Sequence, residues 1–162
     1  MASRVPPAVA GGAYLVFTAI TGVMISYIFW AYTGNTIVLA FALTTGVFGV
    51  MSAIGYTTKR DLSGLGTMLM IGLFGVIIAG VVNWFIGSSM LSWIITLVAL
   101  PIFLGLTVYQ TKQVKELAME AAMRGDERAA SQVAIMGAVG LYVTFLNIFL
   151  ILLRILDIFN GD

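Results

Sequence analysis

The chain has 162 residues, of which 60% are hydrophobic and 9% are charged, and its formal net charge is +1. A soluble domain carries about 25% charged residues, so this composition excludes an ordinary soluble fold. The small net charge argues against nucleic acid as a partner. The sequence contains no cysteine and no histidine. Disulfides, thiolate metal sites and histidine-based acid–base catalysis are therefore not expected.

Charged residues are missing from three long stretches, residues 5–58, 62–111 and 129–153. A transmembrane helix needs roughly 20 apolar residues, so stretches of this length indicate membrane spans. The sequence predicts an all-α integral membrane protein with a single transmembrane domain over residues 1–162. In chain order, the five predicted spans are residues 9–32, 36–56, 67–86, 91–109 and 133–155.

Basic residues are unevenly distributed among the segments that join these spans. The turns at residues 33–35 and 87–90 carry no charge, whereas seven of the eight basic residues fall on the other side. These seven are Arg4, Lys59, Arg60, Lys112, Lys115, Arg124 and Arg128. Under the positive-inside rule the N-terminus is then cytoplasmic and the C-terminus outside. We expect a bacterial cytoplasmic (inner) membrane first and a mitochondrial inner membrane second.

Residues 110–132 form the one sizeable polar segment. The pairs Lys112–Glu116 and Glu120–Arg124 have the four-residue spacing that supports a helix. The fourth helix is therefore expected to continue into the cytoplasm, break at Gly125 and restart with Asp126 as its cap. This helical hairpin is interpreted as a solvated link between two spans, with a docking surface for a soluble partner as the alternative.

Polar residues follow one face of the last span. Thr144, Asn147 and Arg154 share this face with Gly137 and Gly140. Polar groups in hydrocarbon need a partner or a cavity, so the last helix is expected to be interior.

Two polar pairings are predicted for the membrane region. Arg154 and Asp157 are interpreted as an interfacial ion pair, with a pore charge as the alternative for Arg154. Asn83, the amide of the third span, is expected to pair with Asn147 only if both lie at a similar depth.

Four segments carry a resemblance to a known family. They are GYTTKRDLSGLG (55–66), Val82-Asn83, GLTVYQTKQVKE (105–116) and GAVGLYVTFLNIFLILLR (137–154). Together they resemble the Bax inhibitor-1, or transmembrane BAX inhibitor motif, family, which includes bacterial YccA/YetJ-like members. The resemblance runs from Tyr14 to Ile155. It implies seven spans with the last one central, pH-sensitive calcium leak, association of bacterial members with the membrane protease FtsH, and a link to suppression of cell death.

The chain departs from this pattern in two respects. The resemblance begins at the family's third span, so two N-terminal helices are expected to be absent. It also implies a pair of pore carboxylates, and the matching positions hold Gln110 and Thr144. Neutral oxygens neither titrate nor offset a divalent charge, so this ion and proton site is expected to be degenerate. The loop residues Lys59, Arg60 and Asp61 of the first motif are expected on the cytoplasmic side.

Three functions compete on these observations. The first is a non-catalytic membrane subunit or scaffold, stabilised in the bilayer by other membrane subunits or by self-association. The second is an impaired or pH-insensitive ion leak channel. The third is a modulator of a membrane protease through the 110–132 hairpin. No nucleophile–base constellation is present, so neither enzymatic activity nor a cofactor is expected.

Overall fold

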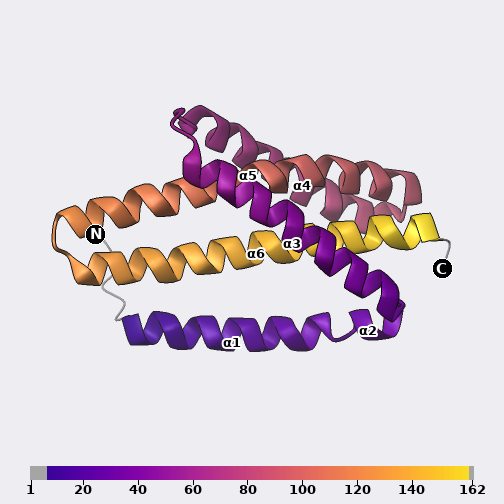
Figure 1. The fold of residues 1–162 in the computed structure, drawn as a ribbon. Coiled ribbons are helices and arrows are strands. Elements are labelled where there is room, and N and C mark those ends of the chain that lie inside the picture. Colours follow the sequence, from indigo (N-terminus) through magenta and orange to yellow (C-terminus); the bar gives the residue numbers. More distant parts are fainter. Residues whose placement is uncertain (1–6, 161–162) are drawn as a thin grey trace.

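The computed structural model describes residues 7–160, and within this range the chain is helical without strands (Figure 1). The helices are α1 (Pro7–Ile25), α2 (Ile28–Ala31), α3 (Gly34–Thr57), α4 (Ser63–Ile86), α5 (Ser89–Met123) and α6 (Glu127–Asn160). Five segments are long and apolar enough to cross a membrane, with Gly11–Ala31 counted as one. The all-α membrane fold predicted from the sequence is confirmed. Arg4, which contributed to the predicted orientation, lies outside the described residues.

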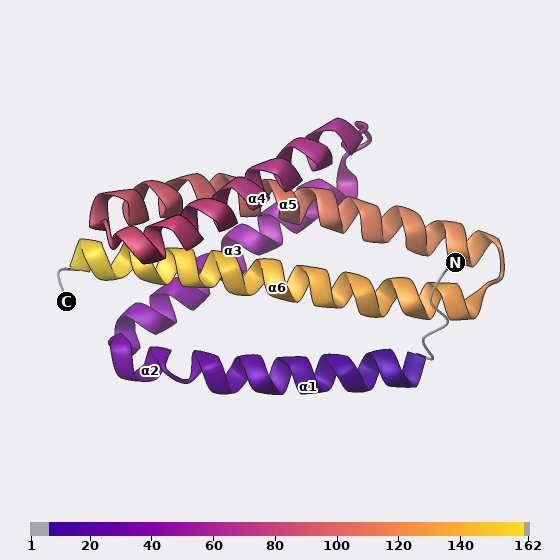
Figure 2. The same ribbon diagram turned by 180° about the vertical axis from the view of Figure 1, so that it is seen from behind.

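Two helices share the centre of the bundle. α6 packs against α1, α3 and α5, and α5 packs against α3, α4 and α6. Figures 1 and 2 show α1 and α4 at opposite edges of the molecule. The core between the central helices contains Ala99, Phe103, Leu106 and Ile148. The last helix is therefore interior, as expected, but it shares this position with α5.

The first predicted span, residues 9–32, corresponds to one candidate span, but its helix is interrupted. The helix ends at Ile25, and a turn at Ser26 and Tyr27 separates it from the short α2. The Ser26 hydroxyl donates to the carbonyl of Val23 at 2.6 Å, and its backbone N–H reaches the carbonyls of both Gly22 and Val23. A serine hydroxyl that competes for a backbone carbonyl bends or interrupts a helix, which explains the break.

The central helices extend well beyond the bilayer core. α5 has 35 residues and α6 has 34, so each is about 50 Å long, against a hydrocarbon core of roughly 30 Å. Between them Gly125 takes a left-handed φ of 65°. The Asp126 carboxylate then accepts the N–H of Ala129 at 2.9 Å. The chain therefore turns at the glycine and restarts with the acidic cap that the sequence indicated.

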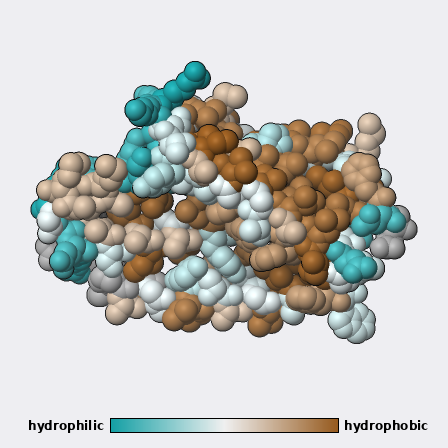
Figure 3. All heavy atoms as spheres, viewed as in Figure 1, coloured by the Kyte–Doolittle hydropathy of each residue, from teal (hydrophilic) through white to brown (hydrophobic). Residues whose placement is uncertain are grey.

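Helix ends differ from the predicted span ends. α4 begins at Ser63 rather than 67, and α6 covers 127–160 rather than 133–155. Hydropathy marks where side chains meet lipid, whereas backbone hydrogen bonding continues past the membrane surface. Figure 3 shows this separation in part, because the most hydrophilic residues gather toward the ends of the molecule and hydrophobic and intermediate residues lie between them.

Candidate functional site

The two residues that the resemblance placed at the ion site meet between the central helices. The Thr144 hydroxyl of α6 donates to the side-chain oxygen Oε1 of Gln110 on α5 at 2.8 Å. Thr144 is only 2% exposed. The pair therefore joins two helices through one partly buried hydrogen bond between uncharged groups.

This contact distinguishes Thr144 from three other buried threonines. Thr44, Thr96 and Thr107 each donate to a carbonyl one turn earlier in their own helix. Such a bond satisfies the hydroxyl without connecting two helices. Thr144 instead donates across the α5–α6 interface, where the packing is close enough for a short polar side chain to reach its neighbour.

Glycines bring α5 and α6 together next to this pair. A Cβ added at Gly137 would come within 2.5 Å of a Val114 methyl, and one at Gly140 would contact the Gln110 amide at 3.9 Å. A cavity of about 250 Å³ is lined by Gln110, Gly137 and Gly140 and continues along the hairpin to Leu117 and Val133. The polar pair thus lies at the inner end of a groove that opens toward the hairpin.

The two membrane amides do not bond to each other. Asn147 donates from Nδ2 to the carbonyl of Val143 in its own helix at 2.8 Å. The side-chain oxygen of Asn83 is buried and has no hydrogen-bond partner among the described residues. Asn147 lines a groove toward α1, whereas Asn83 belongs to α4 at the opposite edge. The conditional pairing of Asn83 with Asn147 is therefore not made.

Lysines of α5 hold the end of α3 and the α3–α4 loop that follows it. Lys112 donates to the carbonyl of Arg60, and it forms an ion pair with Glu116 at 3.4 Å. Lys115 donates to the carbonyl of Tyr56 at 2.7 Å and lies 4.4 Å from the centre of that ring. The sequence suggested no such role, because the partners are backbone carbonyls more than 50 positions away.

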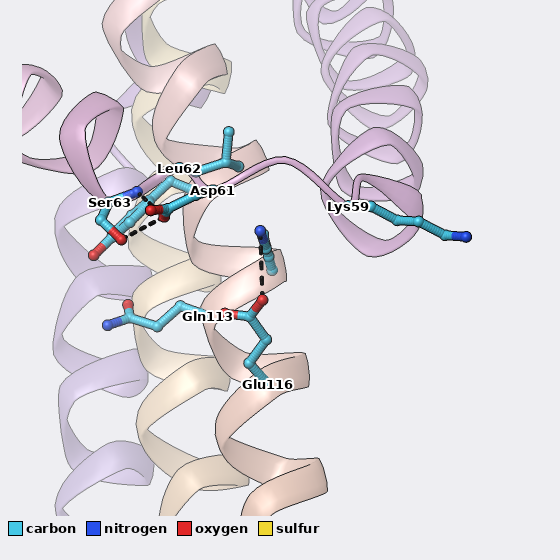
Figure 4. A pocket seen from close by; sticks show the side chains of 8 residues that line it. Lys59, Asp61, Leu62, Ser63, Gln113 and Glu116 are labelled. Atoms are coloured by element: carbon cyan, nitrogen blue, oxygen red, sulfur yellow. Dashed lines mark hydrogen bonds and ion pairs between the residues drawn. The ribbon is translucent and has the colours of Figure 1, made fainter.

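Asp61 caps the start of α4 from the same loop. The hydroxyl and the backbone N–H of Ser63 donate to its carboxylate at 2.5 Å and 2.9 Å. These hydrogen bonds, the hydroxyl first, hold the pKa of Asp61 below its ordinary value. Figure 4 shows Asp61 turned toward Ser63, while Lys59 points away from both. The three predicted loop residues therefore lie in one loop but do not form a single cluster.

The predicted ion pair between Arg154 and Asp157 is not formed. The Arg154 guanidinium donates instead to the hydroxyl of Ser92 near the start of α5. Residues three apart on a helix are neighbours, but the facing helix offers Arg154 a closer acceptor. Asn160 makes a similar link, because its amide donates to the Thr36 hydroxyl at the start of α3 at 3.3 Å. Sequence reasoning missed both tethers, since serine and threonine near helix starts are usually local caps.

Comparisons with known proteins agree with this architecture. The family model described as "Inhibitor of apoptosis-promoting Bax1" matches residues 2–161. The inner membrane protein YbhL of Escherichia coli K12 is 42% identical over 142 residues, which cover 88% of this chain and 60% of that protein. An uncharacterized protein of Deinococcus radiodurans is 39% identical over 154 residues, covering 95% of this chain and 65% of the relative.

An uncharacterized membrane protein of Streptococcus pyogenes serotype M6 is 38% identical over 142 residues, covering 88% of this chain and 60% of the relative. No solved structure matches the chain significantly. The chain thus spans between 60% and 65% of the length of these relatives. The family match over nearly all residues and the identity of about 40% to several bacterial proteins lead to one conclusion: this chain is a membrane protein of the Bax inhibitor-1 family.

Proposed function

We propose that this chain is a non-catalytic integral membrane subunit or scaffold with a Bax inhibitor-1-like fold, stabilised by other membrane subunits. The hydrogen bond from Thr144 to Gln110 is the observation that carries the proposal. The resemblance implies two carboxylates at these positions, where a shared proton would respond to pH. A hydroxyl and an amide bind no proton near neutral pH and leave a divalent cation without compensating charge.

Calcium flux into liposomes tests this proposal. The purified chain is reconstituted at known density, and an enclosed calcium dye reports entry at pH 6 and pH 8. We expect the wild-type chain to show no flux that depends on pH. The double variant Gln110→Asp/Thr144→Asp restores two carboxylates about one hydrogen bond apart, and any flux that it supports should depend on pH.

The control variant is Thr107→Asp, which also introduces a buried acid on α5 but at a threonine that bonds only within its own helix. Circular dichroism of each variant checks that the bundle is retained. Acid-dependent calcium entry through the wild-type chain would contradict the subunit role and support the ion leak channel.

The projecting hairpin favours a second candidate, a modulator of a membrane protease such as FtsH. α5 continues to Met123 and α6 begins at Glu127, so α5 extends about 21 Å beyond its predicted span, which ends at residue 109, and α6 begins about 9 Å before its predicted span at residue 133. Shortening both helices by two turns while keeping the Gly125 turn should abolish co-purification with the protease and leave membrane insertion unchanged. Retained co-purification would exclude the hairpin as the binding element.

We also propose a bacterial inner membrane as the location of this chain. The YbhL relative is named an inner membrane protein, and the composition of the helices suits a bilayer. Fractionation of cells that express the tagged chain at native level provides the measurement. Recovery in the outer-membrane fraction would contradict this location.

A further inference from the structure

A polar cavity of about 380 Å³ lies where the α3–α4 loop meets α5 (Figure 4). We call it the loop cavity, and its lining includes Lys59, Asp61, Ser63, Tyr109, Lys112 and Glu116. The loop joins two candidate membrane spans, of which one ends at Thr57 and the next begins at Ser63. The loop cavity therefore lies at a membrane surface, at the depth of lipid headgroups.

The charged groups inside the loop cavity leave acceptors rather than donors for a ligand. The side chain of Lys112 is only 11% exposed, and its ammonium already donates to the carbonyl of Arg60 and pairs with Glu116. The side chain of Glu116 is 62% exposed, so its carboxylate can accept from a second donor. Both hydrogen bonds from Ser63 reach Oδ1 of Asp61, which leaves Oδ2 for another donor.

Positive charge and apolar surface lie next to these carboxylates. Figure 4 shows Lys59 extending away from the other labelled side chains, so its ammonium lies at the rim of the loop cavity. From Ser63, α4 continues into the membrane and exposes Leu65, Met68 and Ile71. A ligand in the loop cavity thus has a cationic group at the rim and an apolar helix surface beside it.

This arrangement disfavours two common classes of headgroup. An anionic headgroup brings only negative charge, which the two carboxylates repel. A trimethylammonium headgroup carries no N–H donor, so it leaves the carboxylate oxygens without new hydrogen bonds. A primary ammonium offers three donors to the carboxylates, and a phosphate on the same headgroup pairs with the lysine at the rim.

We infer that the loop cavity binds the headgroup of a zwitterionic phospholipid with a primary ammonium, which Asp61 and Glu116 hold while Lys59 pairs with the phosphate. The inference goes beyond the proposed subunit role and does not depend on it. Binding is measured as lipid retained on the chain, so its failure leaves the result of the flux experiment standing.

Native mass spectrometry of the full chain tests this inference. The chain is reconstituted in nanodiscs that contain equal amounts of phosphatidylethanolamine, phosphatidylcholine and phosphatidylglycerol with identical acyl chains, and is then released into a mild detergent. We expect about 3- to 10-fold more phosphatidylethanolamine than phosphatidylcholine to stay bound, since ion pairs at partly exposed positions are individually weak. Less phosphatidylglycerol than phosphatidylethanolamine should stay bound.

Two double variants with the same change in net charge locate the ammonium. Asp61→Asn/Glu116→Gln removes both carboxylates, and Asn keeps an oxygen that can accept from Ser63. This variant should retain phosphatidylethanolamine and phosphatidylcholine equally and gain phosphatidylglycerol. Glu120→Gln/Asp126→Asn also alters one helix cap, but both residues line a separate groove on the hairpin. The preference of the wild-type chain should therefore persist in this control.

Two further measurements examine the phosphate and the source of the ligand. Lys59→Gln should lower the retention of phosphatidylethanolamine and phosphatidylcholine alike, because both carry the phosphate, and should leave their ratio unchanged. O-phosphoethanolamine has the same charged groups without acyl chains. In large excess it should not displace retained phosphatidylethanolamine, since the acyl chains contact the exposed apolar side chains of α4.

Several outcomes would overturn the inference. Equal retention of phosphatidylethanolamine and phosphatidylcholine by the wild-type chain would show that no group in the loop cavity recognises the ammonium. Dominant retention of phosphatidylglycerol would identify an anionic-lipid site instead. A preference that survives Asp61→Asn/Glu116→Gln, or that disappears in Glu120→Gln/Asp126→Asn, would place the site elsewhere. Displacement by O-phosphoethanolamine would identify a soluble ligand, and circular dichroism of each variant checks that the helices are retained.

Discussion

At the scale of single residues, the position of a threonine decides whether it connects helices. Thr107 and Thr144 are both almost completely buried. Thr107 satisfies its hydroxyl within α5, whereas Thr144 donates across the interface to Gln110. The sequence identified Thr144 and Gln110 through the family motifs, but it did not predict which of the threonines would bond across helices. That choice depends on interhelical distance, which hydropathy does not encode.

Replacing Thr144 by valine tests the strength of this link. The Thr144→Val variant keeps the shape of the side chain but leaves the Gln110 oxygen without its donor. We expect a loss of about 0.5–2 kcal/mol in the free energy of unfolding. Thr107→Val is the matched control, because only a bond within one helix is removed, and it should change stability by less than about 0.5 kcal/mol. Unfolding in mixed micelles followed by circular dichroism measures both, and equal losses would argue against a special role for the interhelical bond.

A second prediction at this scale concerns the Asp61 cap. The pKa of Asp61 is lowered, chiefly by the Ser63 hydroxyl. A lowered pKa in the folded state stabilises the capped loop above the ordinary pKa, and this contribution is lost as the pH falls through the lowered value. In Ser63→Ala the pKa should rise toward its ordinary value, so the cap should be lost at a higher pH.

Carbon-13 NMR of the Asp61 carboxyl during an acid titration measures this shift. An unchanged Asp61 titration in Ser63→Ala would show that the hydroxyl contributes nothing to the carboxylate.

At the scale of helices, the existence of the membrane helices was easier to predict than where they break and which faces they pack. Long uncharged stretches are sufficient to predict membrane helices, because the bilayer excludes charge. The break at Ser26 was not predictable in this way, since serine is apolar enough to remain within a span. The glycines within the spans are only partly informative about packing. A Cβ added at Gly137 would meet Val114 of α5, but one added at Gly46 or Gly49 would meet nothing within 4 Å. Small residues permit close packing without determining which face is packed.

Two glycine substitutions distinguish contacts that can relax from those that cannot. A Cβ at Gly55 would overlap the backbone carbonyl of Val108, whereas one at Gly137 meets only the Val114 side chain. Gly55→Ala should therefore cost about 1–3 kcal/mol of stability that no side-chain change recovers. Gly137→Ala should cost less, and adding Val114→Ala should restore stability. Gly46→Ala serves as the control, because a Cβ at this position meets no neighbour within 4 Å. The same unfolding measurement applies to all variants. Rescue of Gly55→Ala by Val114→Ala would contradict the assigned contacts.

At the scale of the whole molecule, polar tethers are concentrated near the two ends of the bundle. At one end, Lys112 and Lys115 hold the α3–α4 loop, and at the other Arg154 and Asn160 connect α6 to the starts of α5 and α3. Between them the surface exposes large hydrophobic residues such as Ile71, Phe74 and Ile78. This division suits a bundle whose middle is solvated by lipid and whose ends are ordered by hydrogen bonds and charge.

The orientation that the basic loops predict for this bundle is open to direct measurement. Lys59 lies in the loop that should face the cytoplasm, and Ser89 lies at the uncharged turn that should face outward. Because the chain contains no cysteine, Lys59→Cys and Ser89→Cys each provide a single reactive thiol. A maleimide that does not cross membranes should label Ser89→Cys in intact spheroplasts, and Lys59→Cys only after the membrane is opened. The two variants report on opposite ends of the same protein, so the labelling of each one serves as the control for the other. The reverse labelling pattern would place the basic loop outside the cytoplasm. The distribution of basic residues would then not determine how this protein inserts into the membrane.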